Sequence, residues 1–259
     1  MTPGGPVGAW GDHVRVNAPK PAFRAYAHRG GSLEACENSL GAFRRASGLG
    51  FTYLETDVRP TRDGVAVLHH DATLDRTTDG RGPVRSRTWR EVQAVHLADG
   101  SAPLRLEELL EDLPDAHVTI DAKEAGAVPA IVDAVRRTRS SDRVCVTSFS
   151  RRRLHRLRML LPSVESGAHP WEVAHLRLRP RSPLPRVSRV QVPPAAFGVR
   201  LDAPRFLDRA HALGLSVDVW TIDDPHEMRR LIDLGVDGIM TDSPTLLRQV
   251  LASEEFSAR

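Results

Sequence analysis

Short apolar runs and amphipathic segments alternate along the second half of the sequence, and this alternation restricts the possible folds more than any other feature. From His117 onward, strand-like runs such as Val144 to Thr147 alternate with segments of helical spacing that stop at Gly214 and Gly235. Strands that alternate with helices form a parallel sheet, because each connecting helix carries the chain back to the same edge. The pattern therefore predicts an α/β protein built on parallel strands.

Nine strand-like runs occur in the chain, one more than a closed eight-stranded barrel needs. The run from Val65 to Leu68 follows its predecessor after only Arg59 to Gly64, whereas a parallel crossover needs about a dozen residues. Asp63-Gly64 is a favoured hairpin turn, so this run is predicted to reverse against the strand before it. The other eight strands are predicted at Arg24 to His28, Thr52 to Val58, Val118 to Ile120, Val144 to Thr147, Val164 to Ala168, Val190 to Val192, Val217 to Trp220 and Val236 to Met240.

Eight strands and a length of 259 residues fit a TIM (β/α)8 barrel, which typically contains about 250 residues. An open doubly wound sheet is the alternative, but no Gly-rich dinucleotide fingerprint follows the first strand. Residues 1–20, rich in Gly and Pro, are predicted to form a flexible leader, and residues 21–259 a single barrel domain. Residues from about 72 to 114 are interpreted as a short insertion with a capping box that starts at Thr88. Asn38 is expected to cap the first barrel helix.

Composition and charge exclude several classes of protein. No run approaches the ~18 apolar residues of a membrane helix and no secretory signal is visible, so a cytoplasmic protein is expected. Cys36 and Cys145 have no metal or redox spacing and are interpreted as plain thiols. The net charge of +3 is mild, and the arginines between Arg151 and Arg158 alternate with leucines at helical spacing. A solvated helix is therefore favoured there over a nucleic-acid surface, and the Arg179 to Arg189 loop is interpreted in the same way.

Ionisable residues stand where the predicted strands end, which is where barrel enzymes place their active sites. His28, Glu55, Asp57 and Asp121 occupy such ends, and the hairpin is expected to return His70 to lie roughly opposite Asp57. Five ionisable groups from four separate elements at one rim indicate a site more strongly than one or two would. The two histidines could supply a general acid and a general base.

Glu55 and Asp57 are two residues apart and so share one face of a strand. Together with Asp121 they would form an all-oxygen site, which suits Mg²⁺ or Ca²⁺ better than Zn²⁺. The alternative for the pair is an ion pair with an arginine of the barrel. Lys123 and Lys20 are the only lysines in an arginine-rich chain, which suggests that the site of Lys123 needs a compact point charge.

Many short motifs occur together in an order that resembles one known family. They are His28-Arg29-Gly30, Glu37-Asn38-Ser39, Glu55-x-Asp57-Val58, Thr61-x-Asp63-Gly64, His70-Asp71, the run Leu74 to Gly82, Asp121-Ala122-Lys123, Ser148-Phe149-Ser150, Trp220-Thr221 and Gly235 to Asp242. In this order and spacing they resemble the glycerophosphodiester phosphodiesterase family. One such motif would be weak, but this many over Phe23 to Val250 is specific.

The resemblance implies hydrolysis of glycerophosphodiesters, such as glycerophosphocholine or glycerophosphoethanolamine, to sn-glycerol 3-phosphate and an alcohol. It implies that His28 and His70 are the acid and base, with His69 the less suitable neighbour. Arg29 and Lys123 would hold the phosphate, whose charge grows in the transition state.

The family also implies a divalent cation, Mg²⁺ or Ca²⁺, bound by Glu55, Asp57 and Asp121. Aspartate at position 121 replaces the glutamate that the family would offer, and Asp223 stands where the family often shows asparagine. Trp220 would either pack against the glycerol carbons or simply fill the barrel.

Two further functions stay open. A phospholipase D-like enzyme that cleaves lysophospholipids on the same fold would need an apolar entrance beside the metal, and the polar insertion from Asp75 to Arg90 speaks against it. A non-catalytic phosphodiester-binding protein has little support, because both histidines and the carboxylate pair are intact. Glu37 and Asn38 either orient His28 or act as a helix cap. The head group, the formation of a cyclic phosphate, the assignment of acid and base and the oligomeric state are open.

Overall fold

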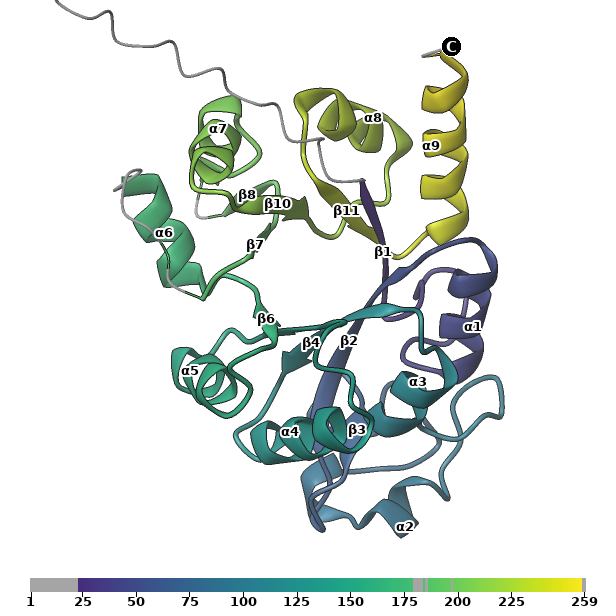
Figure 1. Cartoon of the computed structure of the whole chain (residues 1–259). Coiled ribbons are helices and arrows are strands. Elements are labelled where there is room, and N and C mark those ends of the chain that lie inside the picture. The colour runs from purple at the N-terminus through teal and green to yellow at the C-terminus, as the bar shows by residue number, and fades with distance from the viewer. Residues whose placement is uncertain (1–22, 179–183, 185, 197, 258–259) are drawn as a thin grey trace, which may run out of the picture.

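The computed structural model describes residues 23–178, 184, 186–196 and 198–257. Within them, eight parallel strands form a nearly closed barrel in the order β6-β5-β4-β2-β1-β11-β10-β7. A single parallel bridge between Gly167 and Arg189 joins the two ends of this order. Helices surround the strands on the outside (Figure 1), which confirms the predicted TIM barrel. The predicted leader and part of the Arg179 to Arg189 loop lie outside the described residues.

The eight predicted barrel strands are all present, with ends that differ by a few residues, and helices follow them around the barrel. The barrel strands are β1 (Arg24–His28), β2 (Tyr53–Pro60), β4 (His117–Ala122), β5 (Val144–Thr147), β6 (Glu165–Ser166), β7 (Arg189–Val192), β10 (Ser216–Val219) and β11 (Gly238–Thr241). The surrounding helices are α1 (Leu40–Gly48), α4 (Ala127–Arg137), α5 (Arg151–Leu160), α6 (Pro170–Leu178), α7 (Pro204–Ala212), α8 (Pro225–Leu234) and α9 (Pro244–Ser257).

The ninth strand, β3 (Ala66–Leu68), runs antiparallel to β2, with Val58 opposite Leu68, as the short connection predicted. Gly64 at the turn has a φ of +83°, a left-handed conformation that glycine adopts without strain. Beyond the strand, the backbone N–H of His69 still donates to the carbonyl of Asp57, at 2.9 Å. The hairpin thereby delivers the two adjacent histidines to the rim of the barrel.

The insertion packs against this hairpin and also against the barrel, because Leu106, Leu109 and Leu110 belong to the main hydrophobic core. It forms η1 (Val84–Ser86), α2 (Trp89–Val92) and α3 (Leu106–Asp112). The capping box is confirmed, because the Glu91 carboxylate accepts from the backbone N–H of Thr88 at 2.7 Å and the Thr88 side chain accepts from that of Glu91. A small cluster buries apolar side chains of hairpin and insertion together, namely Val67, Leu74, Val84 and Val92.

The first barrel helix begins one residue later than expected. Ser39 is its N-cap, because the Ser39 hydroxyl accepts from the backbone N–H of Ala42 at 3.1 Å. Asn38 has a φ of +58°, and its side chain turns toward β2 instead. There it accepts from the Thr56 hydroxyl at 2.7 Å and donates to Asp57 at 3.5 Å. The prediction that Asn38 caps this helix is therefore wrong, and its contact is to Asp57 and not to His28.

The arginine-rich helix α5 is an ordinary barrel helix. Leu154 and Leu157 are buried against the barrel, and Arg158 forms an ion pair with Glu172 of α6 at 2.6 Å. This arrangement agrees with the predicted solvated helix. None of the described helices is both long and apolar enough to cross a membrane.

A small hairpin after β7 was not predicted. It consists of β8 (Ala195–Ala196) and β9 (Val199–Arg200), which pair in antiparallel fashion. Because this hairpin follows the carboxyl end of β7, it lies at the same side of the barrel as the carboxyl ends of β1, β2 and β4.

Candidate active site

A cavity of about 650 Å³ opens at the carboxyl ends of the barrel strands. All the side chains predicted for the site line it: His28, Arg29, Glu55, Asp57, His70, Asp121, Lys123 and Trp220. Strand register explains the convergence, because His28 lies opposite Glu55 between β1 and β2, and Asp57 lies opposite Asp121 between β2 and β4. Residues far apart in sequence are thus neighbours at one rim.

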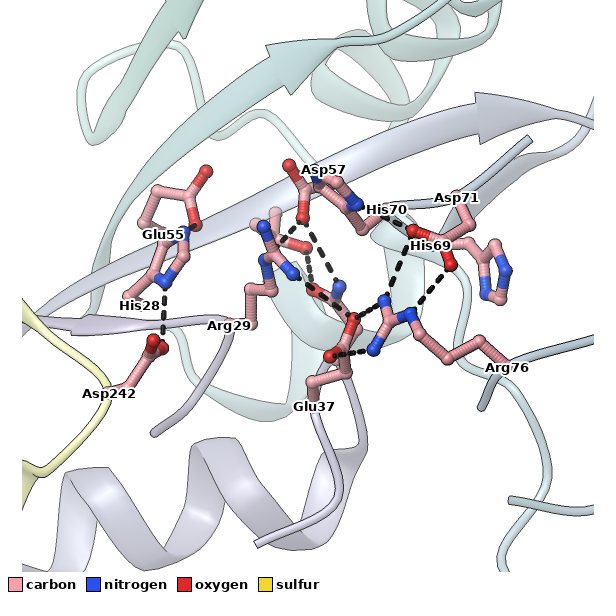
Figure 2. A network of polar contacts seen from close by, with 12 residues as sticks. His28, Arg29, Glu37, Glu55, Asp57, His69, His70, Asp71, Arg76 and Asp242 are labelled. Carbon is pink, nitrogen blue, oxygen red and sulfur yellow. Dashed lines mark hydrogen bonds and ion pairs between the residues drawn. The ribbon is translucent and has the colours of Figure 1, made fainter. Parts of the chain in front are cut away.

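His28 ends β1 and lies between two carboxylates (Figure 2). Its Nδ1 is 2.7 Å from Asp242 Oδ1, and its Nε2 is 3.6 Å from Glu55 Oε2. Burial favours the neutral ring, but the charge of Glu55 and the hydrogen bond to Asp242 outweigh it and raise the pKa of His28. The ring therefore holds its proton to a higher pH than an exposed histidine.

His70 is held in a similar way from the opposite side of the cluster. Its Nδ1 donates to Asp71 at 2.7 Å, and Asp71 in turn accepts from Arg76 Nε at 2.6 Å. Arg76 also donates two hydrogen bonds to Glu37, both at 2.8 Å, and Glu37 accepts from Arg29 at 3.3 Å. Figure 2 shows this chain of alternating charges, which connects Arg29, just after β1, with His70, just after β3.

The adjacent histidine, His69, has a different environment. It is buried, and its Nε2 lies 2.9 Å from the carbonyl of Thr73. Figure 2 shows its ring directed away from Asp57, whereas the ring of His70 lies beside Asp57. The alternation of neighbouring side chains thus selects His70 for the cavity, as predicted.

Asp57 is the centre of the charge cluster. Its Oδ1 lies 2.7 Å from Lys123 Nζ, and its Oδ2 lies 2.9 Å from Arg29 Nε. Lys123 Nζ is also 2.6 Å from Asp121 Oδ2, so one ammonium group bridges two facing carboxylates. The ion pair with a barrel arginine, considered as the alternative for Glu55 and Asp57, is present at Asp57, but that arginine is Arg29, one of the two residues predicted to hold a phosphate.

The buried carboxylates have opposite pKa shifts. Burial, together with the charge of Asp57, raises the pKa of Glu55 to about 7. Burial also raises the pKa of Asp121, although Lys123 opposes it. At Asp57 burial acts in the same direction, but Lys123 and Arg29 outweigh it and lower the pKa. Asp57 is thus a fixed negative charge, and Glu55 can exchange a proton near neutral pH.

The donor atoms fit a hard cation. Glu55 Oε2 and Asp121 Oδ1 are buried and accept no hydrogen bond from the described residues. Such oxygens are costly to bury alone and are the preferred ligands of Mg²⁺ and Ca²⁺. Among the described residues, no three acidic, histidine or cysteine side chains converge closely enough to hold an ion as they stand. The ammonium of Lys123 lies between Asp57 and Asp121 and supplies the positive charge there.

Trp220 and Asp223 have clear environments at the end of β10. Trp220 lines the cavity and packs edge-on against Phe149, with ring centroids 6.1 Å apart. Asp223 accepts from the Thr241 hydroxyl and from the backbone N–H of Asp242, both at 2.8 Å. It therefore fixes the turn that presents Asp242 to His28, a structural role that an asparagine oxygen could also fill.

Sequence reasoning missed several supporting residues. Asp242, the partner of His28, directly follows the last barrel strand, and β11 pairs with β1. The available signal was a carboxylate one residue beyond β11, the strand that pairs with the strand of His28. No local pattern connects Glu37 with Arg76, because their hydrogen bond spans 39 residues and depends on how the insertion folds back.

The parallel barrel, with histidines, carboxylates and cations gathered at its carboxyl rim, defines the protein as a TIM-barrel enzyme. The chain belongs to the glycerophosphoryl diester phosphodiesterase family, whose model matches residues 28–246. It is therefore a glycerophosphodiester phosphodiesterase, as the motif resemblance implied. Members of this family generally use a divalent cation.

Relatives support this assignment over nearly the whole chain. A probable glycerophosphodiester phosphodiesterase 2 of Mycobacterium tuberculosis is 43% identical over 237 residues, which cover 88% of this chain and 90% of the relative. A glycerophosphodiester phosphodiesterase crystal structure from Agrobacterium tumefaciens superposes with a TM-score of 0.77 at 28% identity, covering 89% of this chain and 99% of that one. A phosphodiesterase from Oleispira antarctica shares the fold, with a TM-score of 0.76 at 22% identity over 88% of this chain and 96% of that one.

Proposed function

We propose that the enzyme hydrolyses glycerophosphodiesters to sn-glycerol 3-phosphate and an alcohol, with His28 and His70 as its acid–base pair. The observation that carries this proposal is the shared geometry of the two rings. Each Nδ1 lies 2.7 Å from an aspartate, Asp242 or Asp71, and both rings line one cavity. A carboxylate on Nδ1 fixes the tautomer, stabilises the imidazolium and leaves Nε2 for proton transfer.

Arg29 and Lys123 would bind the phosphodiester beside these histidines. Both are paired with Asp57 within 3 Å, so they are already oriented toward one point of the cavity. Preorganised cations favour the transition state of phosphoryl transfer, because its equatorial oxygens carry the developing charge. Trp220 would pack against the glycerol carbons from the apolar side.

Glu55, Asp57 and Asp121 would hold the divalent cation, Mg²⁺ or Ca²⁺. When bound, it would polarise a phosphoryl oxygen and offset the charge of the three carboxylates. The two buried oxygens without donors, on Glu55 and Asp121, support this assignment. So does the raised pKa of Glu55, because a nearby cation would favour its ionised form.

The substrate class is supported by the relatives. The Oleispira antarctica phosphodiesterase was crystallised with the product sn-glycerol-3-phosphate, and we extend that product to this chain. The cytoplasmic location and the lack of a nucleic-acid partner stay predictions.

The direct test is turnover of glycerophosphocholine with Mg²⁺ or with Ca²⁺, followed as release of sn-glycerol 3-phosphate. His28→Ala and His70→Gln should each reduce kcat by about 10²- to 10⁴-fold, and EDTA should abolish turnover. His69→Gln is the matched control, since its ring is buried against Thr73 and should affect kcat little. Absence of product with either metal and several head groups would overturn the proposal, and tight binding without turnover would indicate a phosphodiester-binding protein instead.

A substrate whose leaving group has a low pKa can show which of the two histidines is the general acid and which is the general base. Such a leaving group needs no proton, so a nitrophenyl phosphodiester should restore the rate of the variant that lacks the general acid and not of the variant that lacks the base. Equal restoration in both variants would contradict an acid–base division between His28 and His70.

A further inference from the structure

The positive charge of the chain is concentrated on one side of the barrel. The segment from Arg151 to Ala212, which contains α5, α6 and α7, has thirteen arginines and four acidic residues. Its net charge is therefore +9, whereas the whole chain carries only +3, so the other residues are acidic on balance. Figure 1 shows α5, α6 and α7 as neighbours along one side of the barrel, so the charges of these three helices are also grouped in space.

The exposed arginines of these helices form no ion pairs within the described chain. They are Arg151, Arg152 and Arg156 of α5, Arg177 of α6 and Arg205 of α7. Three of the four acidic residues of the segment are already paired with other arginines, namely Glu165, Glu172 and Asp202. Asp208, the fourth, is exposed on α7. Five uncompensated guanidinium groups thus face a single free carboxylate on this side of the described chain.

Four arginines converge on a pocket of about 660 Å³ between α6 and α7. They are Arg177, Arg200, Arg205 and Arg209, and Leu178 and Phe206 contribute apolar surface to the same pocket. Within the described chain no acidic residue lines it, and the carboxylate of Asp202, which pairs with Arg200, is buried. Arg209 Nη1 donates to the backbone carbonyl of Arg177 at 2.7 Å, which fixes one of the four guanidinium groups. Guanidinium groups gathered in this way are suited to phosphate oxygens.

Large apolar side chains are exposed on the same helices. Trp171 is 73% exposed and Leu178 is 80% exposed, and because they are seven residues apart they share one face of α6. Leu178 also lines the arginine pocket. Met159 and Leu160 are exposed at the end of α5, so four of the six large apolar side chains exposed in the described chain lie on α5 and α6. Clustered exposed apolar groups are typical of interaction surfaces.

We propose that this face of α5, α6 and α7 is a docking surface for an anionic lipid bilayer, and that the arginine pocket receives the phosphate of a lipid head group. Charge complementarity determines the choice of partner, because anionic lipids give a bilayer a negative surface potential that attracts basic surfaces. The exposed apolar residues favour a bilayer over a nucleic acid. Tryptophan prefers the membrane–water interface, whereas an exposed leucine gains nothing from a phosphate backbone.

The docking surface goes beyond the proposed function, because its arginines and apolar residues are not the acid–base or metal-binding groups. Two contributions to binding should act together. A basic residue near an anionic surface strengthens binding about fivefold, and added salt screens this attraction. Immersion of an exposed tryptophan or leucine adds about tenfold and does not depend on screening. We therefore expect binding that requires anionic lipid at low salt and decreases as salt is added.

The test measures partition of the full chain onto sedimented unilamellar vesicles, without substrate. Partition onto vesicles of equal parts phosphatidylglycerol and phosphatidylcholine should exceed that onto phosphatidylcholine alone by at least tenfold. On the mixed vesicles, Arg205→Gln should weaken partition about fivefold and Trp171→Ser about tenfold. Both positions are exposed, so the variants should keep the wild-type denaturant midpoint and report on the surface alone.

Matched controls come from the other side of the barrel. Arg248 is an exposed arginine of α9, which Figure 1 places away from α5, α6 and α7, and it forms no ion pair within the described chain. Leu33, between β1 and α1, is 67% exposed. Arg248→Gln and Leu33→Ser should each keep the wild-type partition onto the mixed vesicles within about twofold.

Each other outcome overturns the docking surface. Equal partition onto both kinds of vesicle would remove the role of anionic lipid, and equal losses in Arg205→Gln and Arg248→Gln would show that only net charge matters. Binding of a single-stranded RNA oligonucleotide without binding to the mixed vesicles would indicate a nucleic-acid surface instead. Because no substrate is present, failure of this test leaves the proposed function standing.

Discussion

Both ends of the barrel interior hold buried charges, but only one end satisfies them. Toward the amino ends of the strands, Asp218 accepts from Arg24 at 2.6 and 3.1 Å and from the Tyr26 hydroxyl at 2.9 Å. Arg189 donates to the same hydroxyl at 2.7 Å and pairs with Glu165. At the carboxyl ends, by contrast, Glu55 and Asp121 each keep a buried oxygen without a donor.

The difference separates a structural charge network from a site. The network at the amino ends also fits closely against β11. A Cβ on Gly238 would lie 2.6 Å from Asp218 Oδ1, so a glycine at this position leaves room for the ion pair. Every unsatisfied buried oxygen costs about 1–3 kcal/mol. The fold tolerates this cost at the rim of the cavity, where a ligand can satisfy the oxygens, and avoids it in the closed layer below.

Breaking the closed network should produce the largest loss of stability. Asp218→Ala leaves Arg24 and the Tyr26 hydroxyl without their shared acceptor. Removal of one partner of a buried ion pair costs about 3–5 kcal/mol. Denaturant unfolding measures the change. Asp208→Ala, at an exposed position on α7, is the control and should stay within about 0.5 kcal/mol. Similar losses in both variants would contradict a structural role for the network.

The open end should give stability an unusual pH dependence. Because the pKa of Glu55 is raised from 4.5 to about 7, the folded protein keeps a proton that the unfolded chain releases at lower pH. Proton binding is then greater in the folded state, so stability falls as pH rises from about 4.5 to about 7, by a total on the order of 3 kcal/mol from this group. The measurement is unfolding free energy against pH with EDTA present.

Glu55→Gln removes this titration, so the difference in unfolding free energy between wild type and variant should shrink or reverse sign as pH rises through that window. Glu111→Gln, on an exposed position of α3, should keep the wild-type dependence. Added divalent cation should flatten the wild-type curve if the carboxylates bind it. A difference that grows in favour of wild type with rising pH would refute the raised pKa.

Asp121→Asn should have a small effect on stability and a large effect on activity, in contrast to the large stability loss expected for Asp218→Ala. The variant removes a buried charge that has one oxygen without a donor, so its unfolding free energy should change by less than about 1 kcal/mol. Its activity should fall by about two orders of magnitude, as when one preorganised electrostatic contact to the transition state is lost. Denaturant unfolding and turnover on the same preparation check both parts, and a large stability loss with full activity would place Asp121 with the structural charges.

The two ends also differ in how far the sequence predicts them. The strand ends and the short hairpin connection are local patterns, so His28, Glu55, Asp57 and His70 could be assigned to one rim in advance. Partners from distant segments could not be assigned, because the bond from His28 to Asp242 spans 214 residues. The side chain of Asn38 could not be placed in advance either. Ser39 is an equally good cap and takes the cap position, and Asn38 adopts a left-handed backbone instead.

The apolar side of the cavity, lined among others by Val173 of α6 and Val199 of β9, escaped prediction for a related reason. The strands of the β8–β9 hairpin have two residues each, too few to show any periodicity. Residues such as Val173 and Val199 look like ordinary core residues in the sequence. Only the closure of the barrel places them across the cavity from the histidines.

The smallest expected effect concerns the chain of charges that supports His70. Arg76 is 49% exposed, so Arg76→Met should change stability by no more than about 1 kcal/mol. It should nonetheless lower kcat about tenfold, because Asp71 loses the guanidinium that holds it against His70. Arg76→Lys should restore only part of the rate, since a lysine cannot make the paired contacts to Asp71 and Glu37.

The pH profile distinguishes such a positioning role from simple destabilisation. The hydrogen bond from Arg76 is the largest influence that holds the pKa of Asp71 well below its usual range. Without it, the Asp71 carboxylate takes up a proton at higher pH and releases Nδ1 of His70. The acid limb of kcat/KM should therefore move to higher pH in Arg76→Met. Arg85→Met, an exposed arginine of the insertion outside this chain of charges, should leave the limb in place. An unshifted limb with an unchanged kcat in Arg76→Met would show that the network only stabilises the insertion, and would move Arg76 to the structural side of the comparison.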